Sequence, residues 1–362
     1  MIIGIDASRV FTEKETGVEY YSRALLKALF KLGGKHQFIL YSKRPLNFRL
    51  PTNFKNKVLK MPYLWTQIRL SLEMLFNPSD ILFVPSHCLP IIHPRRSVVT
   101  IHDLGFKKYP TAYNFFEFLY LAFSTWYSVK TALKIIAISK TTKDDIIRYY
   151  KIPPKKIKVI YLGFKRRKPS TTFWRSDRQK VVLGKYILYI GRIDRKKNLK
   201  RLIHAFKLLK KEEKFPHRLF LVGKDGFGAG EIKKEASGES LIKFFGYQKD
   251  KRINELLAGA SALVLPSLYE GFGMPVLEAF YLGIPVLASN IKSAREIYGN
   301  AALLVDPLSV KEIKKGLLRI LTDENLRNEL IKRGRQQAKN FSWQKCALET
   351  LMVLKNLSAI NN

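Results

Sequence analysis

Cysteine is scarce in this 362-residue chain. Cys88 and Cys346 are the only two, which excludes a disulfide framework and a cysteine-rich metal site. Long apolar runs are also missing, since the longest stretches without a charged residue, 81–94 and 256–269, have 14 residues each and contain proline. A membrane-spanning helix needs about 20. The first residues lack the basic and apolar segments of a signal peptide, so we expect a cytoplasmic protein in a reducing compartment.

Acidic residues are few as well. The chain has 29 acidic and 65 basic residues, which gives a net charge of +36, and the excess is larger in the first half. Such a field favours anionic partners, namely phosphates, nucleic acids or acidic lipids, although a generally basic surface explains it equally well. A basic nucleic-acid-binding protein is the alternative class. Because no nucleic-acid-binding motif is present and the charge is dispersed, we expect no specific nucleic acid partner.

Two series of short apolar strands alternate with helical segments, in a chain of 46% apolar residues. The first series comprises residues 2–5, 37–41, 81–84, 97–101 and 134–138. The second comprises residues 186–190, 219–222, 243–245, 262–265, 286–288 and 303–305. This alternation predicts parallel sheets with helices on both faces, and the length suits two hydrophobic cores. The predicted fold class is α/β with two Rossmann-like domains.

The apolar pattern lapses at residues 164–183, which are polar and basic, and we interpret them as a linker. The N-terminal domain is then 1–163 and the C-terminal domain 184–342. A last helix within 343–362 is expected to pack back toward the N-terminal domain. Ligands of such sheets bind beyond the carboxyl ends of the strands, so two domains in tandem are expected to face each other across a cleft.

Two positions in the first domain suit a phosphate or a sugar. Gly17 precedes a helix and lets the backbone approach a phosphate closely, although an ordinary turn glycine fits as well. His102 directly follows the strand at 97–101, where an imidazole can hydrogen-bond a substrate or hold a backbone carbonyl in place. A structural role is its alternative. His87 and His93 flank proline-rich turns and are interpreted as structural.

The loop at residues 191–198 contains four cations within six positions. A departing nucleoside diphosphate needs positive charge, which a metal ion or positioned arginine and lysine side chains supply. The chain contains no Asp-x-Asp sequence, so a metal clamp of that type is missing. Arg192 and Lys197 are therefore the candidates, and a solvated basic turn is the alternative.

The segment 270–278 reads Glu-Gly-Phe-Gly-Met-Pro-Val-Leu-Glu. Its two glycines free backbone amides, and its proline suits the first position of a helix whose N-terminus can bind an anion. The carboxylates of Glu270 and Glu278 flank this site and can accept hydrogen bonds from sugar or ribose hydroxyls. Glu278 could instead complement the helix dipole.

These motifs together resemble those of glycosyltransferase family 4. Glu270 and Glu278, eight positions apart, match the family's Glu-x7-Glu motif. The similarity runs from about residue 2 to residue 357 and includes Ile101-His-Asp-Leu104, Ala137-Ile-Ser-Lys140, Tyr186-Ile-Leu-Tyr-Ile-Gly-Arg192 and Gly283-Ile-Pro-Val286. The opening segment is similar to mannosyl- and rhamnosyltransferase-type members. The chain departs from the family pattern in having one glycine, Gly17, where two are frequent, and Leu162 where asparagine is usual.

The resemblance implies the GT-B fold, an acceptor-side N-terminal domain and a donor-binding C-terminal domain. It also implies transfer that needs no metal and retains the anomeric configuration. His102 would lie by the donor sugar, Glu270 would bind its hydroxyls, and Arg192 and Lys197 would hold the diphosphate. The remaining donor contacts would come from Gly17, Tyr247, Glu278 and the amides of Phe272, Gly273 and Met274. Among these, the resemblance implies that Tyr247 would line the base pocket and that Glu278 would bind the ribose.

We therefore expect a hexosyltransferase of polysaccharide biosynthesis that uses a nucleotide sugar. Mannose from a GDP donor is the first choice, a UDP-sugar is the alternative, and the acceptor is a glycan or a lipid-linked glycan. No cofactor and no metal are expected. No enzymic nucleophile is apparent, which favours front-face substitution. A nucleotide-sugar epimerase or a non-catalytic sugar-binding homologue would share the fold but not the chemistry.

Residues 115–127 are strongly aromatic, and residues 63–65 are similar. A basic, aromatic surface can dock on anionic lipid at the inner face of the cytoplasmic membrane. The interpretation that we favour for residues 115–127 is a core helix of the first domain, with peripheral membrane contact as the alternative.

Overall fold

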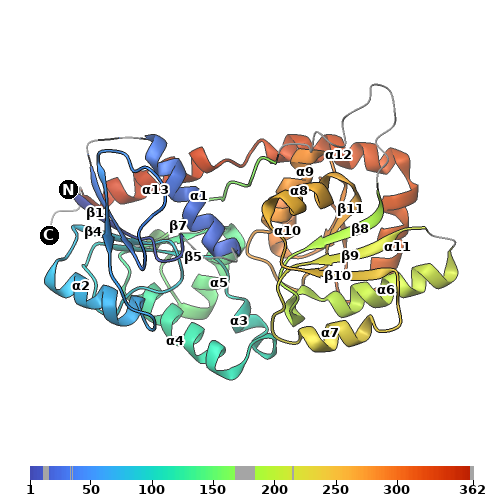
Figure 1. The fold of residues 1–362 in the computed structure, drawn as a ribbon, viewed down its shortest axis with the longest axis horizontal. Coiled ribbons are helices and arrows are strands. Elements are labelled where there is room, and N and C mark those ends of the chain that lie inside the picture. Colours follow the sequence, from blue (N-terminus) through green and yellow to red (C-terminus); the bar gives the residue numbers. More distant parts are fainter. Residues whose placement is uncertain (11–15, 33, 35, 168–183, 214–215, 359–362) are drawn as a thin grey trace. The chain divides into compact units, whose positions relative to one another are not determined.

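The computed structural model describes residues 1–10, 16–32, 34, 36–167, 184–213 and 216–358 (Figure 1). The chain divides into two compact units, each with its own sheet. Unit 1 contains residues 1–108, 115–163 and 341–362, and unit 2 contains residues 109–114 and 164–340. Of the expected linker, residues 168–183 lie outside the described part of the chain.

Unit 1 is built on a seven-stranded sheet in the order β3-β2-β1-β4-β5-β6-β7, with all neighbours parallel. Strands β4 and β5 are buried along their whole length, as parallel strands covered on both faces must be. The strands are β1 Ile2–Asp6, β2 Gln37–Ser42, β3 Phe54–Val58, β4 Ile81–Val84, β5 Ser97–Ile101, β6 Lys134–Ala137 and β7 Ile157–Val159.

Helices cover both faces of this sheet. In Figure 1, α1 and α13 lie on one face and α2 and α4 on the other, and α13 packs along α1. The α-helices are α1 Gly17–Leu32, α2 Ser71–Phe76, α3 Gly105–Lys108, α4 Phe115–Thr131, α5 Lys140–Tyr150 and α13 Trp343–Ser358. A π-helical segment, η1 Thr66–Leu70, precedes α2, and η3 Pro154–Lys156 precedes β7.

Unit 2 has a six-stranded parallel sheet in the order β10-β9-β8-β11-β12-β13. Its strands are β8 Gly184–Ile190, β9 Arg218–Val222, β10 Ile242–Gly246, β11 Ala260–Leu265, β12 Val286–Ser289 and β13 Leu303–Val305. Numbered in chain order within each unit, the six strands of unit 2 run 3-2-1-4-5-6, the order of doubly wound Rossmann folds, and the unit 1 sheet has the same order with a seventh strand added at its edge. The predicted fold class, two Rossmann-like parallel-sheet domains, is confirmed.

The α-helices of unit 2 flank its sheet. They are α6 Leu199–Glu212, α7 Ala229–Glu235, α8 Asp250–Ala258, α9 Met274–Leu282, α10 Lys292–Tyr298, α11 Val310–Thr322 and α12 Glu324–Ala338. Two short helices, η2 Pro110–Ala112 and η4 Arg195–Lys197, complete the unit. Helix α11 packs on α6, and α12 packs on α9.

The favoured interpretation of residues 115–127 as a core helix is wrong. These residues form most of α4, whose buried side chains are Ser124, Thr125, Ser128 and Val129, whereas most of its large aromatic side chains are exposed. In the other aromatic segment, Tyr63 is exposed but Trp65 is buried and donates a hydrogen bond to the Leu59 carbonyl at 2.6 Å. None of the helices in the described part of the chain is long and apolar enough to cross a membrane.

Candidate active site

The chemistry-bearing loops of unit 2 follow β8 and β11, the two strands between which the strand order reverses. Ligands of open parallel sheets bind outside the carboxyl ends of the strands at this reversal. The loop after β8 contains residues 191–198, and the loop after β11 contains residues 266–273. Their backbones are joined by a hydrogen bond from the Leu268 amide to the Lys196 carbonyl at 2.9 Å. Two segments about 75 positions apart in the sequence thus form one surface.

Lys197 and Glu270 form the centre of this surface. The Lys197 Nζ donates to Glu270 Oε1 at 2.5 Å, and the Ser267 hydroxyl donates to the same oxygen at 2.7 Å. Both charged side chains are largely buried, with 13% of each exposed. An ion pair with this little solvent has stronger electrostatics than a surface pair and keeps its members in one geometry. The arrangement therefore places one cation and one hydroxyl-accepting carboxylate side by side.

The 191–198 loop is held by its own polar groups. Asp194 caps η4 by accepting a hydrogen bond from the Lys197 amide at 3.2 Å. Burial raises the pKa of the Asp194 carboxyl, and the nearby Lys197 opposes that shift. Asn198 adopts a left-handed conformation and donates to the carbonyls of Pro266 and Pro307. These bonds fix the backbone from which Lys197 extends.

Arg192 lies on the same loop but is exposed. Its carbonyl accepts a hydrogen bond from the buried Tyr189 hydroxyl at 2.8 Å. Its side chain passes so close to Gly226 that a Cβ there would lie 2.6 Å from the Arg192 Nε. The backbone of Arg192 is thus fixed, and its guanidinium extends along the loop that follows β9.

Gly273 forms the N-cap of α9 and requires glycine. Its φ is +81°, in the left-handed region, and a Cβ at this position would overlap the Tyr298 hydroxyl. That hydroxyl donates to the Phe272 carbonyl at 3.2 Å. Met274 is the first residue of the helix, so the amides near it point away from the helix, where the N-terminus favours an anion.

Glu278, in the second turn of α9, contacts a residue that the sequence analysis did not identify. Arg167 Nε donates to Glu278 Oε2 at 2.5 Å, and another Arg167 nitrogen donates to Asn254 Oδ1 at 2.6 Å. Both members of the pair are buried. Burial raises the pKa of the Glu278 carboxyl, and the Arg167 guanidinium opposes that shift. The carboxylate expected to bind ribose is thus held by a cation that comes just before the undescribed segment.

Tyr247 lies immediately after β10, at the same edge of the unit 2 sheet. The Lys224 Nζ, which follows β9, lies 5.6 Å from the centre of the Tyr247 ring. The carboxyl ends of these strands are tied by a hydrogen bond from the Gly223 amide to the Gly246 carbonyl at 2.9 Å. A half-buried ring beside a lysine is suited to stack on a flat aromatic group.

In unit 1, Gly17 is the first residue of α1. Thr16 and Glu19 form a capping box around it, in which the Thr16 amide and hydroxyl both donate to Glu19 Oε2. Arg9 lies 3.5 Å from the other oxygen of Glu19. The box fixes the start of α1 and so the backbone of Gly17.

His102 is buried at the carboxyl end of β5. Burial lowers the pKa of the imidazole, and its Nε2 lies 2.9 Å from the Pro85 carbonyl. A carbonyl only accepts, so Nε2 carries the proton of the neutral ring and Nδ1 is its acceptor. The ring packs edge-on against Tyr21 at 4.7 Å and stacks on His87 at 5.4 Å. His93 interacts with Pro94, Ser97 and Thr131 of its own surroundings.

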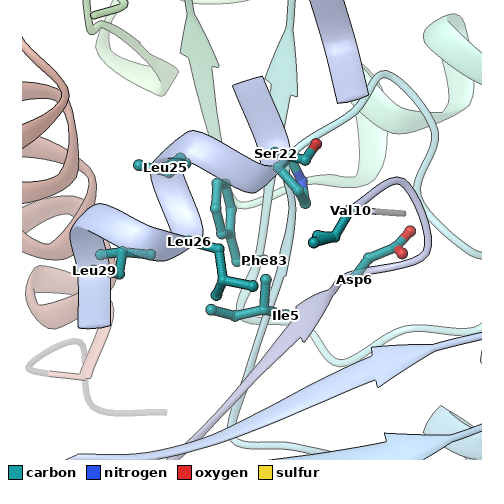
Figure 2. A pocket seen from close by; sticks show the side chains of 9 residues that line it. Ile5, Asp6, Val10, Ser22, Leu25, Leu26, Leu29 and Phe83 are labelled. Carbon is teal, nitrogen blue, oxygen red and sulfur yellow. The ribbon is translucent and has the colours of Figure 1, made fainter. Parts of the chain in front are cut away.

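A pocket in unit 1 lies between α1 and the strands β1 and β4, at which the strand order reverses (Figure 2). Asp6, its one charged residue, ends β1. Oδ1 of Asp6 accepts from the Ser8 amide at 2.9 Å, while Oδ2 is buried with no hydrogen-bond partner in the described part of the chain. Burial raises the pKa of this carboxyl. The residues that line the pocket are Ile5, Asp6, Val10, Ser22, Leu25, Leu26, Leu29, Phe83 and Pro85.

Of the expected residues, the structure brings Lys197 and Glu270 into direct contact, while Glu278 contacts Arg167. Asp6 and Arg167 were not found from the sequence. Asp6 could have been identified from the sequence, because it is an acidic residue at the end of an apolar strand. Arg167 could not, because it lies in a run of cations and nothing distinguishes it from its neighbours. Within the described ranges, no group of three or more histidine, cysteine, aspartate or glutamate residues could hold a metal ion.

Comparison with known families and proteins gives consistent results. The model of the family described as "Glycosyl transferases group 1" matches residues 170–337, and that of "Glycosyltransferase Family 4" matches residues 16–167. The O-antigen chain mannosyltransferase B of Escherichia coli is 32% identical over 269 residues, which cover 72% of this chain and 71% of the relative. The O-antigen chain mannosyltransferase RfbU of Salmonella typhimurium is 28% identical over 247 residues, covering 67% and 65%.

Solved structures share the fold across the whole chain. A sucrose-phosphate synthase from Thermosynechococcus elongatus superposes with a TM-score of 0.77 and 21% sequence identity, covering 99% of both chains. At this level of identity the likeness concerns the architecture of two Rossmann-like domains.

Proposed function

The chain belongs to glycosyltransferase family 4, and on this premise we propose that it transfers a hexose, with mannose as the first choice, from a nucleoside diphosphate sugar to a glycan or lipid-linked acceptor. The observation that carries the proposal is the largely buried pair of Lys197 and Glu270 where the unit 2 strand order reverses. The donor would be a GDP- or UDP-sugar. It is a substrate, so the reaction involves no separate cofactor.

We assign the diphosphate to the cations after β8 and to the N-terminus of α9. When the bond from the sugar to the diphosphate breaks, negative charge grows on the leaving phosphate. Lys197 is already oriented by Glu270, and the amides of Gly273 and Met274 begin α9, so these groups need little reorganisation to stabilise that charge. Arg192 supplies a second cation from the same loop. In this proposal the protein provides the stabilisation without a metal.

We assign the donor sugar to Glu270 and the ribose to Glu278. Glu270 already accepts from a lysine and a serine hydroxyl, which is how a carboxylate receives sugar hydroxyls. The Glu278 carboxylate is held by Arg167, so ribose binding would replace the guanidinium as its partner. Donor binding would therefore release Arg167. Tyr247, with Lys224 beside it, would stack on the base.

For unit 1, we propose that His102 accepts a hydrogen bond from a donor-sugar hydroxyl through Nδ1. Its lowered pKa keeps the ring neutral and Nδ1 able to accept at neutral pH. Gly17, fixed by its capping box, would bring its backbone to the diphosphate. With no enzymic nucleophile assigned, the acceptor hydroxyl would attack from the face that the diphosphate leaves, which retains the anomeric configuration.

Mannose is proposed because the two relatives by sequence reported above, from Escherichia coli and Salmonella typhimurium, are mannosyltransferases by name. The same relatives favour a role in polysaccharide synthesis, and we propose a cytoplasmic location at the inner face of the membrane. The test is a panel of GDP- and UDP-sugars with lipid-linked acceptors, in which free nucleoside diphosphate and the anomeric configuration of the product are measured. Release that requires acceptor, with a retained anomer, is expected. Conversion of the donor sugar without acceptor would indicate an epimerase instead.

A further inference from the structure

Helix α4 turns its polar face toward the protein and its apolar face toward solvent. Its buried face consists mainly of hydroxyl side chains, Ser124, Thr125 and Ser128, whereas its exposed face contains Phe115, Phe116, Leu119, Phe123 and Trp126. Phe116 is 80% exposed and Phe115 68%. Of these hydroxyls, that of Ser128 accepts a hydrogen bond from the Leu89 amide at 2.8 Å and donates one to the Ser124 carbonyl at 2.6 Å. Because a helix that only covers a sheet places its apolar side inward, this orientation calls for an apolar environment outside.

The neighbouring segment of η1 and α2 also exposes large apolar side chains. It buries Leu70 and Met74 together with Ser71 and Glu73. Its exposed apolar side chains are Ile68, Leu72, Leu75 and Phe76, the last to 74%. Just before η1, Tyr63 and Leu64 are 81% and 60% exposed. Leu64 has a φ of +47°, a conformation that costs a non-glycine residue on the order of 1 kcal/mol. The chain thus presents a large apolar side chain to solvent on a strained backbone.

Residues 88–92 join the two helices into one apolar surface. On one side, the Gln67 side chain donates to the Leu89 carbonyl at 3.3 Å, and the Ile92 amide donates to Ser71 Oγ at 3.3 Å. On the other side, the Tyr127 hydroxyl of α4 donates to the Ile91 carbonyl at 2.5 Å. Ile91 and Ile92 are themselves exposed, and Figure 1 shows α2 and α4 on the same face of the unit 1 sheet. We call this the α2/α4 surface.

Cations flank the α2/α4 surface, and its acidic residues are few. Lys60, Arg95 and Lys130 are exposed at the edges of its segments. The acidic residue of α2, Glu73, is buried and paired with Lys57 and Arg69. On α4 the one acidic residue is Glu117. An exposed aromatic face with a basic rim is the composition that proteins use at the headgroup level of an anionic bilayer.

We propose that the α2/α4 surface docks on an anionic lipid bilayer, with the rings of α4 at the level of the acyl boundary and the rim cations on the lipid phosphates. A second copy of the chain fits less well, because it would bring two basic rims together in a protein of net charge +36. The inference deepens the membrane contact proposed above and rests on that part of the proposed function. Sugar transfer does not depend on it.

The test is flotation of the full chain with vesicles of phosphatidylcholine and phosphatidylglycerol in about equal parts, and with phosphatidylcholine alone. The test variant is F116D/F123D on α4, and the matched control is L348D/M352D on the exposed side of α13. We expect the wild type and the control to float with the anionic vesicles. F116D/F123D should lose binding by at least about tenfold, because binding scales with the apolar area inserted. Lys60→Gln and Arg95→Gln should each weaken it by about fivefold, because each removes one positive charge.

The proposal is overturned if the wild type does not float with anionic vesicles, if it floats equally with phosphatidylcholine alone, or if both double variants behave alike. Sedimentation of the same proteins tests whether a second copy of the chain covers the surface instead. A wild-type dimer that becomes a monomer in F116D/F123D would assign the surface to a second copy. Melting of each variant with and without nucleoside diphosphates checks folding and donor binding. If nucleoside diphosphates still raise the melting temperature of F116D/F123D, the donor site is intact in this variant. The outcome for lipid binding then leaves the sugar-transfer proposal unaffected.

Discussion

Units 1 and 2 share a strand order, yet the ends of their central strands and their outer surfaces differ. At the reversal of strand order, unit 2 has Glu270 paired with Lys197, whereas unit 1 has Asp6, one oxygen of which has no hydrogen-bond partner among the described residues. Outside, unit 1 exposes the apolar α2/α4 surface, whereas the large exposed apolar side chains of unit 2, in its described residues, are Phe227, Tyr281 and Leu308. One architecture therefore presents a buried charge pair in unit 2 and an exposed apolar surface in unit 1.

The paired charges on the unit 2 surface reinforce this contrast. Exposed lysines and arginines of unit 2 form ion pairs with exposed carboxylates, as in Lys200 with Glu231 and Lys233 with Asp225. Such pairs add little stability, but they reduce the local excess of positive charge. In unit 1, the Glu73 carboxylate of α2 is buried and pairs with Lys57 and Arg69. The rim residues Lys60, Arg95 and Lys130 are exposed.

Among the tests of this contrast between the two units, the largest effect, on turnover, is expected for Lys197→Ala and Glu270→Ala in unit 2. Each should lower turnover by about 100-fold or more, because a preorganised group at the leaving diphosphate or the donor sugar is lost. Acceptor-dependent release of nucleoside diphosphate measures this. The matched control is Lys200→Ala, an exposed lysine three positions later, which should stay within about twofold of wild type. Near-normal rates of folded Lys197→Ala and Arg192→Ala would remove the assignment.

The next effect concerns the Arg167 pair. Arg167→Ala leaves the buried Glu278 carboxylate without its guanidinium, and loss of one member of a buried pair costs about 3 kcal/mol or more. The free energy of unfolding, measured with urea, should fall accordingly. Arg166→Ala, at the exposed neighbouring position, is the control and should change it by less than about 0.5 kcal/mol.

Arg167→Ala also tests the proposal that the donor ribose replaces Arg167 as the partner of the Glu278 carboxylate. If the donor replaces Arg167 at Glu278, a nucleoside diphosphate should raise the melting temperature of Arg167→Ala at least as much as that of the wild type. A variant that no longer responds to nucleotide would show that Arg167 itself binds the donor, and the proposed exchange would be wrong.

A third effect concerns the backbone at the start of α9. Gly273→Ala should destabilise unit 2 by about 2 kcal/mol or more, because the residue has a positive φ and its Cβ would overlap the Tyr298 hydroxyl. Gly230→Ala, in α7 with open space around it, should be neutral or slightly stabilising. Adding Tyr298→Phe to Gly273→Ala should recover part of the loss. No recovery would mean that the overlap is not the cause.

The smallest effect is a pH dependence in unit 2. Burial, with Arg327 nearby, lowers the pKa of His217 from its usual value to about 4. The unfolded chain therefore binds a proton that the folded chain does not, so the free energy of unfolding falls as pH falls from about 6.5 to about 4. The contribution is on the order of 1 kcal/mol, since the residue is partly exposed. His217→Gln should flatten the profile in this range, and an unchanged slope would contradict the assignment.

The fold and the centre of the unit 2 site could be predicted because their signals are local. Each apolar strand of the chain is a contiguous run, and Lys197 and Glu270 each belong to a loop that directly follows such a run. Their meeting follows from the adjacency of β8 and β11 in a doubly wound sheet. The residues that lie near the carboxyl ends of the strands could thus be read from the sequence.

Two features could not be predicted in this way. Arg167 meets Glu278 across 111 positions, and nothing local distinguishes it from the cations beside it. Helix α4 buries small hydroxyl side chains, one of which accepts a hydrogen bond from the Leu89 amide 39 positions earlier, whereas its apolar composition alone indicated a buried helix. Both features involve polar contacts between distant positions, which leave no periodic pattern in the chain.

The most direct test of the account is the binding of nucleoside diphosphate sugars to the wild type, Lys197→Ala and Lys200→Ala, measured by calorimetry over a panel of GDP- and UDP-sugars. The account predicts that at least one donor binds the wild type and Lys200→Ala with the same affinity and binds Lys197→Ala at least about tenfold more weakly. Absence of binding by every nucleotide sugar, or equal binding by all three proteins, would contradict the donor site at β8 and β11.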